Sequence, residues 1–205
     1  MDFLPKVDQV RASLAQSSEA MNRLFHSSLV LEQILSASEA ILKSYQRGGS
    51  LFVAGNGGSA ADAQHFVAEL VVKLDQDRDP IRAFALTVDT SILTAIGNDY
   101  SFEKIFERQV QGLMTSNDLF FAITTSGNSK NILAALQACK NKGVSTLLLT
   151  GESGGKAREL ADGLITVPAS RTSQIQECHL AVYHVLCALI ERDLVSHGLC
   201  QYRPS

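Results

Sequence analysis

The chain contains no tryptophan, only four cysteines and no excess of positive charge. The cysteines form no Cys-x-x-Cys pair and no dense framework, which argues against a disulfide scaffold and predicts reduced thiols. They are Cys139, Cys178, Cys187 and Cys200. The net charge of −3 provides no basic field, so we expect no binding of nucleic acid through its phosphates.

Long apolar runs are also missing. No run approaches the roughly 18 residues that a membrane-spanning helix needs. The first residues, MDFLPKVDQV, lack the basic start and apolar core of a secretory signal. We therefore expect a soluble, cytoplasmic protein with no membrane partner. Apolar residues at 45% and charged residues at 19% of 205 residues are typical of one globular domain with an ample core.

Residues 1–48 show helical periodicity and little else. Val7, Val10 and Leu14 recur at spacings of three and four, and the pattern returns in the second half of the segment. That second set is Leu31, Ile34, Leu35, Ile41 and Leu42. We predict a helical hairpin that ends at Gly48-Gly49 and helps to assemble subunits, because an apolar helical stripe must be buried against something.

From residue 49 to 205, short apolar runs alternate with helical stretches, which is typical of an α/β fold with a parallel sheet covered on both faces. We predict five strands, at 51–54, 83–87, 119–124, 145–150 and 164–167. The predicted helices lie at 59–73, 101–114, 129–141, 154–161 and 172–195. In such folds ligands bind beyond the carboxyl ends of the strands, so the loops there are the places to look for a site.

The first of these loops, Gly55–Ser59, joins a buried strand to a helix. Glycines allow close approach of a ligand to the backbone, and the helix N-terminus favours an anion or polar oxygens. His65 and Glu69 follow on one face of that helix, four residues apart. The loop also satisfies a loose dinucleotide-binding pattern, but Asp89 lies almost thirty residues after Ala60, too far for the acidic residue of that pattern.

A second strand end brings together several hydroxyl groups. Thr124, Thr125, Ser126 and Ser129 lie around a glycine, directly before a helix. Hydroxyls and free backbone amides are suited to a sugar phosphate, so we predict a phosphate site here in preference to an elaborate helix cap. Gly97–Asp99 lies between two helical stretches, where Asn and Asp commonly form a turn, and by itself it does not decide between a simple turn and a site.

The last predicted helix carries Gln176, Glu177, His179 and His184. With His65 and Glu69 these side chains could form a metal or acid–base cluster, although either histidine could be an ordinary interior residue. Gln176 and His184 are eight residues apart, about 12 Å along an ideal helix. They could therefore share an ion only if the helix is irregular or if two copies of the chain contribute.

These motifs resemble the SIS (sugar isomerase) domain family and, within it, the phosphoheptose isomerases. The family's GNGGSAADAQHFAAEL is GNGGSAADAQHFVAEL here, and its AIGND is Ala95–Asp99. Its STSGNS becomes TTSGNS, and its RIQE…H becomes QIQE…H. The resemblance covers about residues 48–190 and implies a single SIS domain with a flavodoxin-like five-stranded parallel sheet.

By that resemblance, the chain is expected to be an aldose–ketose isomerase of sedoheptulose 7-phosphate, at the first step of nucleotide-heptose biosynthesis. The resemblance implies one Zn²⁺ per site, bound by His65, Glu69, Gln176 and His184, with Glu69 and His184 as the acid–base pair. Together with Glu69 and Gln176, the implied substrate-binding residues are Asn56, Gly57, Gly58, Asn98, Asp99, Thr124, Thr125, Ser126 and Ser129. A homotetramer with sites between subunits is also implied.

Three positions depart from the family pattern. Val72-Lys73 replaces a common Gly-Arg, Arg82 replaces proline, and Gln174 replaces arginine. The rival interpretation is a non-catalytic SIS protein that binds the bacterial replication initiator, but such a protein lacks the counterparts of Glu69 and His184. The presence of both groups here favours the enzyme, because acid–base catalysis requires them.

Overall fold

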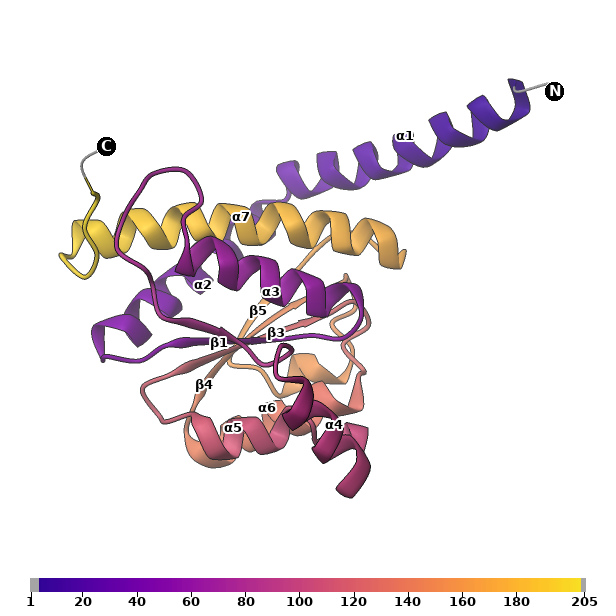
Figure 1. Cartoon of the computed structure of the whole chain (residues 1–205). Coiled ribbons are helices and arrows are strands. Elements are labelled where there is room, and N and C mark those ends of the chain that lie inside the picture. Colours follow the sequence, from indigo (N-terminus) through magenta and orange to yellow (C-terminus); the bar gives the residue numbers. More distant parts are fainter. Residues whose placement is uncertain (1–3, 204–205) are drawn as a thin grey trace.

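A five-stranded parallel sheet lies between two layers of helices in the computed structural model, which describes residues 4–203 (Figure 1). The strand order is β2-β1-β3-β4-β5. The strands are β1 (Leu51–Ala54), β2 (Ala83–Ala85), β3 (Leu119–Thr124), β4 (Ser145–Thr150) and β5 (Gly163–Thr166). The predicted α/β fold with five parallel strands is therefore confirmed.

Seven α-helices and two short 3₁₀ helices connect and cover the strands in this part of the chain. The α-helices are α1 (Leu4–His26), α2 (Ser28–Gln46), α3 (Gly58–Val71), α4 (Thr90–Asp99), α5 (Glu107–Leu113), α6 (Lys130–Lys142) and α7 (Thr172–Ser196). The 3₁₀ helices are η1 (Phe102–Lys104) and η2 (Lys156–Glu159).

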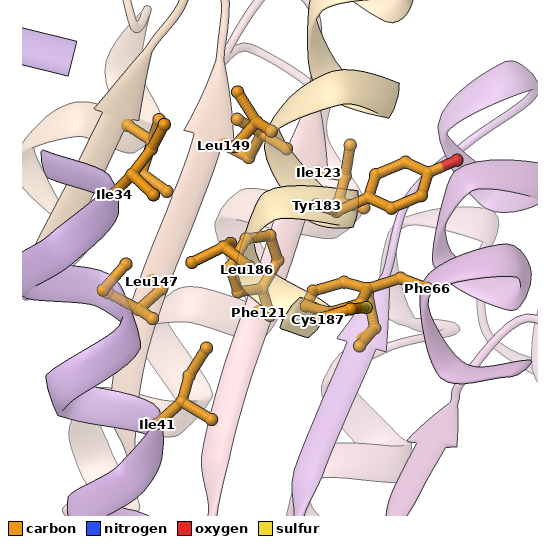
Figure 2. Close-up of a cluster of buried hydrophobic side chains, with 14 of the residues drawn as sticks. Ile34, Ile41, Phe66, Phe121, Ile123, Leu147, Leu149, Tyr183, Leu186 and Cys187 are labelled. Carbon is orange, nitrogen blue, oxygen red and sulfur yellow. The ribbon is translucent and has the colours of Figure 1, made fainter. Parts of the chain in front are cut away.

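The sheet is buried on both faces because its strands are apolar at successive positions, as expected for parallel strands. One face packs against α2, α3 and α7, where Phe66, Phe121 and Tyr183 are fully buried (Figure 2). The opposite face packs against α4, α5 and α6, around Phe106 and Phe120 (Figure 1). The first of these cores fixes α3 and α7 side by side on the same face of the sheet (Figure 1).

The two predicted N-terminal helices are present, and residues 1–3 of the predicted segment lie outside the described residues. They meet at Ser27, whose hydroxyl accepts a hydrogen bond from the Val30 amide and starts α2. Helix α1 extends away from the body past α7 (Figure 1). Exposed apolar side chains line it, including Val10, Leu14 and Phe25 at 58%, 66% and 71% exposure.

Some predicted elements differ from the observed ones. Gly97–Asp99 is the last turn of α4 and not a turn between helices; the helix begins after Asp89, whose carboxylate accepts a hydrogen bond from the Ile92 amide. The single helix predicted at 101–114 is divided into η1 and α5. The helix predicted at 154–161 is only the 3₁₀ helix η2, preceded by two glycines with positive φ.

All four cysteines are buried and free, as the sequence predicts. No helix within residues 4–203 combines the length and apolarity that crossing a membrane would require. Arg82, one of the three departures from the family pattern, donates to the carbonyl oxygens of Gly48 and Gly49. It therefore ties the start of β2 to the turn before β1.

Candidate functional site

The loop after β1 brings the backbone close to a side chain of α7. Gly57 has a φ of +56°, which favours glycine. At Gly58 a Cβ atom would lie 2.2 Å from Nε2 of Gln176, so a side chain there would displace the glutamine. The first turn of α3 and the first turns of α7 are thus in direct contact.

The hydroxyl-rich loop after β3 lies beside the loop after β1, because β1 and β3 are neighbours in the sheet. Asn56 and Asn131 link the loops through two reciprocal amide hydrogen bonds of 2.8 Å. Ser129 occupies the N-cap position of α6, yet its side chain makes no capping hydrogen bond. Capping therefore does not explain the Ser129 hydroxyl, which lies 3.4 Å from the hydroxyl of Thr124.

A cavity of about 420 Å³ opens at this edge of the sheet, with Thr125, Ser126 and Asn128 in its lining. Gly127, with a φ of +65°, packs against the backbone of Gly154, where a Cβ atom would come within 1.9 Å of the carbonyl oxygen. This close packing holds the hydroxyl-rich loop in one conformation. The two loops, with Gln176, are called the anchor region below.

His65, Glu69 and His184 form a second group, with one potential ligand atom from each side chain within 4.8 Å of the others. His65 and Glu69 lie on α3, and His184 lies on α7. His65 Nε2 is 2.9 Å from Glu69 Oε1, and the two side chains are 42% and 19% exposed. The helix spacing seen in the sequence therefore gives a three-residue cluster, completed by a histidine more than a hundred residues later.

The donors of this triad fit a divalent cation. His184 Nε2 is buried and has no hydrogen-bond partner, which is costly for a nitrogen unless something binds it. Two imidazoles and a carboxylate are typical ligands of Zn²⁺, with bonds of about 2.0–2.2 Å. With all three ligand atoms within 4.8 Å of one another, the side chains converge on one point.

Gln176 does not join the triad within one chain. Helix α7 is continuous from Thr172 to Ser196, so the irregularity that would bring Gln176 to His184 is absent. Gln176 contacts Gly58 at one end of α3, and His65 contacts Tyr183 about two turns further on. Its role as a ligand of the same ion remains a prediction that needs a second copy of the chain.

Asn98 and Asp99 lie on α4, on the other face of the sheet from the triad. They are exposed at the end of α4, where the Asn98 amide donates to the Asp99 carboxylate at 2.9 Å. Asp99 lines a separate cavity of about 410 Å³ with Tyr100 and Arg108, whose guanidinium lies 4.1 Å from the Tyr100 ring centre. The predicted substrate contacts of Asn98 and Asp99 remain predictions.

Arg78 and Tyr183 lie near the triad and are not marked by any sequence motif. Arg78 is buried and donates to the Glu191 carboxylate at 2.7 Å and to the carbonyl oxygens of Glu69 and Leu70 at 2.8 Å. It thereby caps the end of α3 and ties it to α7. Tyr183 places its hydroxyl 2.9 Å from His65 Nδ1. Arg78 lies in a loop without periodicity, and Tyr183 is one apolar position in a helical stripe, so no local signal marks either.

The two histidines of α7 have different environments. His179 is fully buried, has no hydrogen-bond partner on either ring nitrogen, and lies outside the triad. Burial lowers the pKa of His179 to about 4 from its ordinary 6.5, so this imidazole is neutral near pH 7. Spacing alone left the choice between the two histidines open, and the structure brings His184, not His179, beside His65 and Glu69.

The triad predicts binding of one divalent cation per chain. His184→Asn should lower the affinity for Zn²⁺ by more than the 10–100-fold typical of losing an outer-shell partner, because it removes a direct ligand. Isothermal titration with Zn²⁺ measures this. His197→Asn, at the exposed end of α7, is the matched control and should bind as the wild type does. Equal affinities in the two variants would contradict the site.

Burial of His179 predicts a pH dependence of stability. Between about pH 6.5 and 4 the unfolded chain binds a proton on this residue and the folded chain does not, so stability falls as the pH falls. The full effect is about 3 kcal/mol. Urea unfolding of His179→Leu should show a smaller decline over this range than the wild type. His197→Leu should keep the wild-type decline, and identical slopes in all three proteins would refute the assignment.

Comparison with known proteins adds the family. The family model described as SIS domain matches residues 14–151. Phosphoheptose isomerase 2 of Campylobacter jejuni is 45% identical over 189 residues, covering 92% of this chain and 94% of the relative. The family match and the sequence identity do not depend on the geometry of the triad, so they support the family assignment independently.

Solved structures show the same similarity at the level of the fold. A phosphoheptose isomerase from Francisella tularensis superposes with a TM-score of 0.87 at 34% identity, covering 91% of this chain and 98% of the other. The phosphoheptose isomerase of Neisseria gonorrhoeae gives 0.83 at 38% identity, with 90% and 98% covered. By sequence over most of its length and by fold, the chain belongs to the SIS domain family, in the group that contains the phosphoheptose isomerases.

Proposed function

We propose that the chain isomerises sedoheptulose 7-phosphate to D-glycero-D-manno-heptose 7-phosphate, the first step towards a nucleotide-activated heptose. The observation that carries the proposal is the meeting of Glu69 with His65 and His184 within 4.8 Å. Relatives at 38–45% identity that are named phosphoheptose isomerases support it. The same relatives leave the non-catalytic alternative without support. Four free cysteines fit the reducing conditions of the cytoplasm.

The reaction moves one hydrogen between two neighbouring carbons. The Glu69 carboxylate removes a proton from C1 of the ketose, which gives a cis-enediol, and returns a proton to C2. His184 moves the second proton from the oxygen on C1 to the oxygen on C2, so atoms and charge balance. A zinc ion held by the triad would polarise the carbonyl group and stabilise the negative charge that develops on oxygen.

The anchor region is suited to the phosphate end of the substrate. Thr124, Thr125, Ser126 and Ser129 offer hydroxyls beside the N-terminus of α6, a helix of 13 residues whose first amides favour an anion. Asn56–Gly58 offer backbone amides from the adjacent strand end. Binding the remote phosphate would orient the reacting carbons over the acid–base pair.

We further propose that one chain supplies the anchor region and a neighbouring chain supplies the triad, in a homotetramer. Within one chain Gln176 lies with Gly58, and Glu69 lies eleven residues further along α3, about 16 Å away along the helix. A site that uses Gln176 beside Glu69 therefore needs two copies. The exposed apolar side chains of α1 and α2 support association, because large apolar patches mark contact surfaces.

Replacing the base tests the reaction. Glu69→Gln should nearly abolish conversion of sedoheptulose 7-phosphate to the aldose in a coupled assay, because the amide cannot accept the carbon-bound proton. Glu159→Gln, the same change at an exposed position of η2, should keep wild-type turnover. Unchanged turnover in Glu69→Gln would rule out this base.

Mixing two inactive variants tests the shared site. Glu69→Gln inactivates the triad and Gln176→Ala inactivates the anchor region. An interface between one chain of each variant would contain one complete site, with the anchor region of the first chain and the triad of the second. If the two variants pair at random, about half of the interfaces contain one chain of each kind. Each such hybrid interface has one complete site out of two, so co-expression should restore about a quarter of wild-type turnover. No recovery in hybrids confirmed by native mass spectrometry would contradict a shared site.

A further inference from the structure

Tyr183 combines full burial with a polar contact to the triad. Its ring stacks on Phe66 at 5.6 Å between centres and meets His65 and His184 edge-on at 5.5 and 5.0 Å. Figure 2 shows the ring within the apolar cluster and its hydroxyl directed away from that cluster. The hydroxyl lies 2.9 Å from His65 Nδ1. Phenylalanine would fill the same space, so packing alone does not account for the hydroxyl.

The two ring nitrogens of His65 have different partners. Nε2 lies 2.9 Å from Glu69 Oε1, and Nδ1 lies 2.9 Å from the Tyr183 hydroxyl. A neutral imidazole carries one N–H. When Nε2–H donates to the Glu69 carboxylate, Nδ1 must accept a hydrogen bond from the tyrosine hydroxyl.

Binding of a cation at Nε2 requires the opposite tautomer. Nε2 must then be unprotonated, so the hydrogen lies on Nδ1 and needs an acceptor. A hydroxyl serves both tautomers of His65, since it can donate to Nδ1 or accept from it, whereas a carbonyl oxygen can only accept. Tyr183 is therefore a suitable partner both without and with a bound cation.

In the second arrangement the hydroxyl hydrogen needs an acceptor, for which the Asp62 carboxylate is the candidate. Asp62 lies on α3 one turn before His65, and its Oδ2 is buried without a hydrogen-bond partner. Burial is the main cause that raises the pKa of Tyr183 above its ordinary value, and the charge of Asp62 is the next largest. The hydroxyl therefore remains protonated. The nearby Glu69 carboxylate acts in the same direction.

We propose that Tyr183 is a positioning residue that fixes the ring orientation and tautomer of His65, so that His65 presents Nε2 to a divalent cation beside Glu69 and His184. This inference rests on the metal site of the proposed function. It assigns a role to a residue that touches neither the ion nor the substrate, and it acts only through His65.

Tyr183→Phe in the full-length chain tests the proposal, because it keeps the ring and removes the hydroxyl. Its affinity for Zn²⁺, measured by isothermal titration, should fall about 10–100-fold, as is typical when an outer-shell partner is lost. Tyr45→Phe is the matched control: the Tyr45 hydroxyl donates to the Arg82 carbonyl oxygen at 2.9 Å, away from the triad. This control should bind Zn²⁺ as the wild type does.

A second measurement separates positioning from general loosening of the core. ¹⁵N NMR of histidine-labelled protein should show the Nε2–H tautomer of His65 in the metal-free wild type and the Nδ1–H tautomer with Zn²⁺. In metal-free Tyr183→Phe the signal should move towards a mixture of tautomers, while the urea midpoint in EDTA stays near that of Tyr45→Phe.

The outcomes are distinguishable. A wild-type chain that does not bind Zn²⁺ overturns the metal site, and this proposal with it. Wild-type binding together with an unchanged affinity and an unchanged His65 signal in Tyr183→Phe overturns the role of Tyr183 alone and leaves the proposed function standing.

Discussion

Phe66 on α3 stacks against Tyr183 on α7, and Phe66 also meets Phe121 in the central strand edge-on at 5.2 Å. The offset between contacting residues is 118 positions both at His65–Tyr183 and at Gly58–Gln176, so the two helices run side by side in the same direction. The triad and the Gly58–Gln176 contact both depend on this packing. If α7 slid by one turn, His184 would move about 5.4 Å from Glu69 and the triad would be lost.

Arg78 and Glu191 strengthen the same contact at its far end. A buried ion pair contributes little net stability unless its remaining hydrogen-bonding groups are satisfied, and here the guanidinium also binds two carbonyl oxygens of α3. The carbonyl of Glu69 is one of them, so the clamp holds the residue that carries the candidate base. Apolar packing brings the helices together, and this polar network fixes their register.

In the proposed function, anchoring and chemistry lie at different ends of α3. The first turn faces the hydroxyl-rich loop and Gln176, and the last turns carry His65 and Glu69. Under the proposed function, a phosphosugar that uses both ends of α3 would meet two chains, and this would give the chain a physical reason to associate. The exposed apolar side chains of α1, including Leu14 at 66% exposure, are available for that association.

The sequence by itself determined the local features of this protein. Apolar runs of four to six residues bounded by glycine or polar turns predict the strands, and a spacing of four places His65 and Glu69 on one helix face. The positions of the anchor loops also followed, because parallel strands end at the same edge. These are properties of neighbouring residues, so a linear pattern carries them.

Only the tertiary structure decided the partners that are distant in sequence. His184 in place of His179, the hydroxyl of Tyr183 on His65, and the Arg78 clamp all depend on how α7 rotates and shifts against α3. That arrangement is set by the fit of buried rings such as Phe66 and Phe121 in a core shared by helices and strands, together with the Arg78 network. A one-dimensional pattern records which face of a helix is apolar, but not the rotation and register at which that face packs.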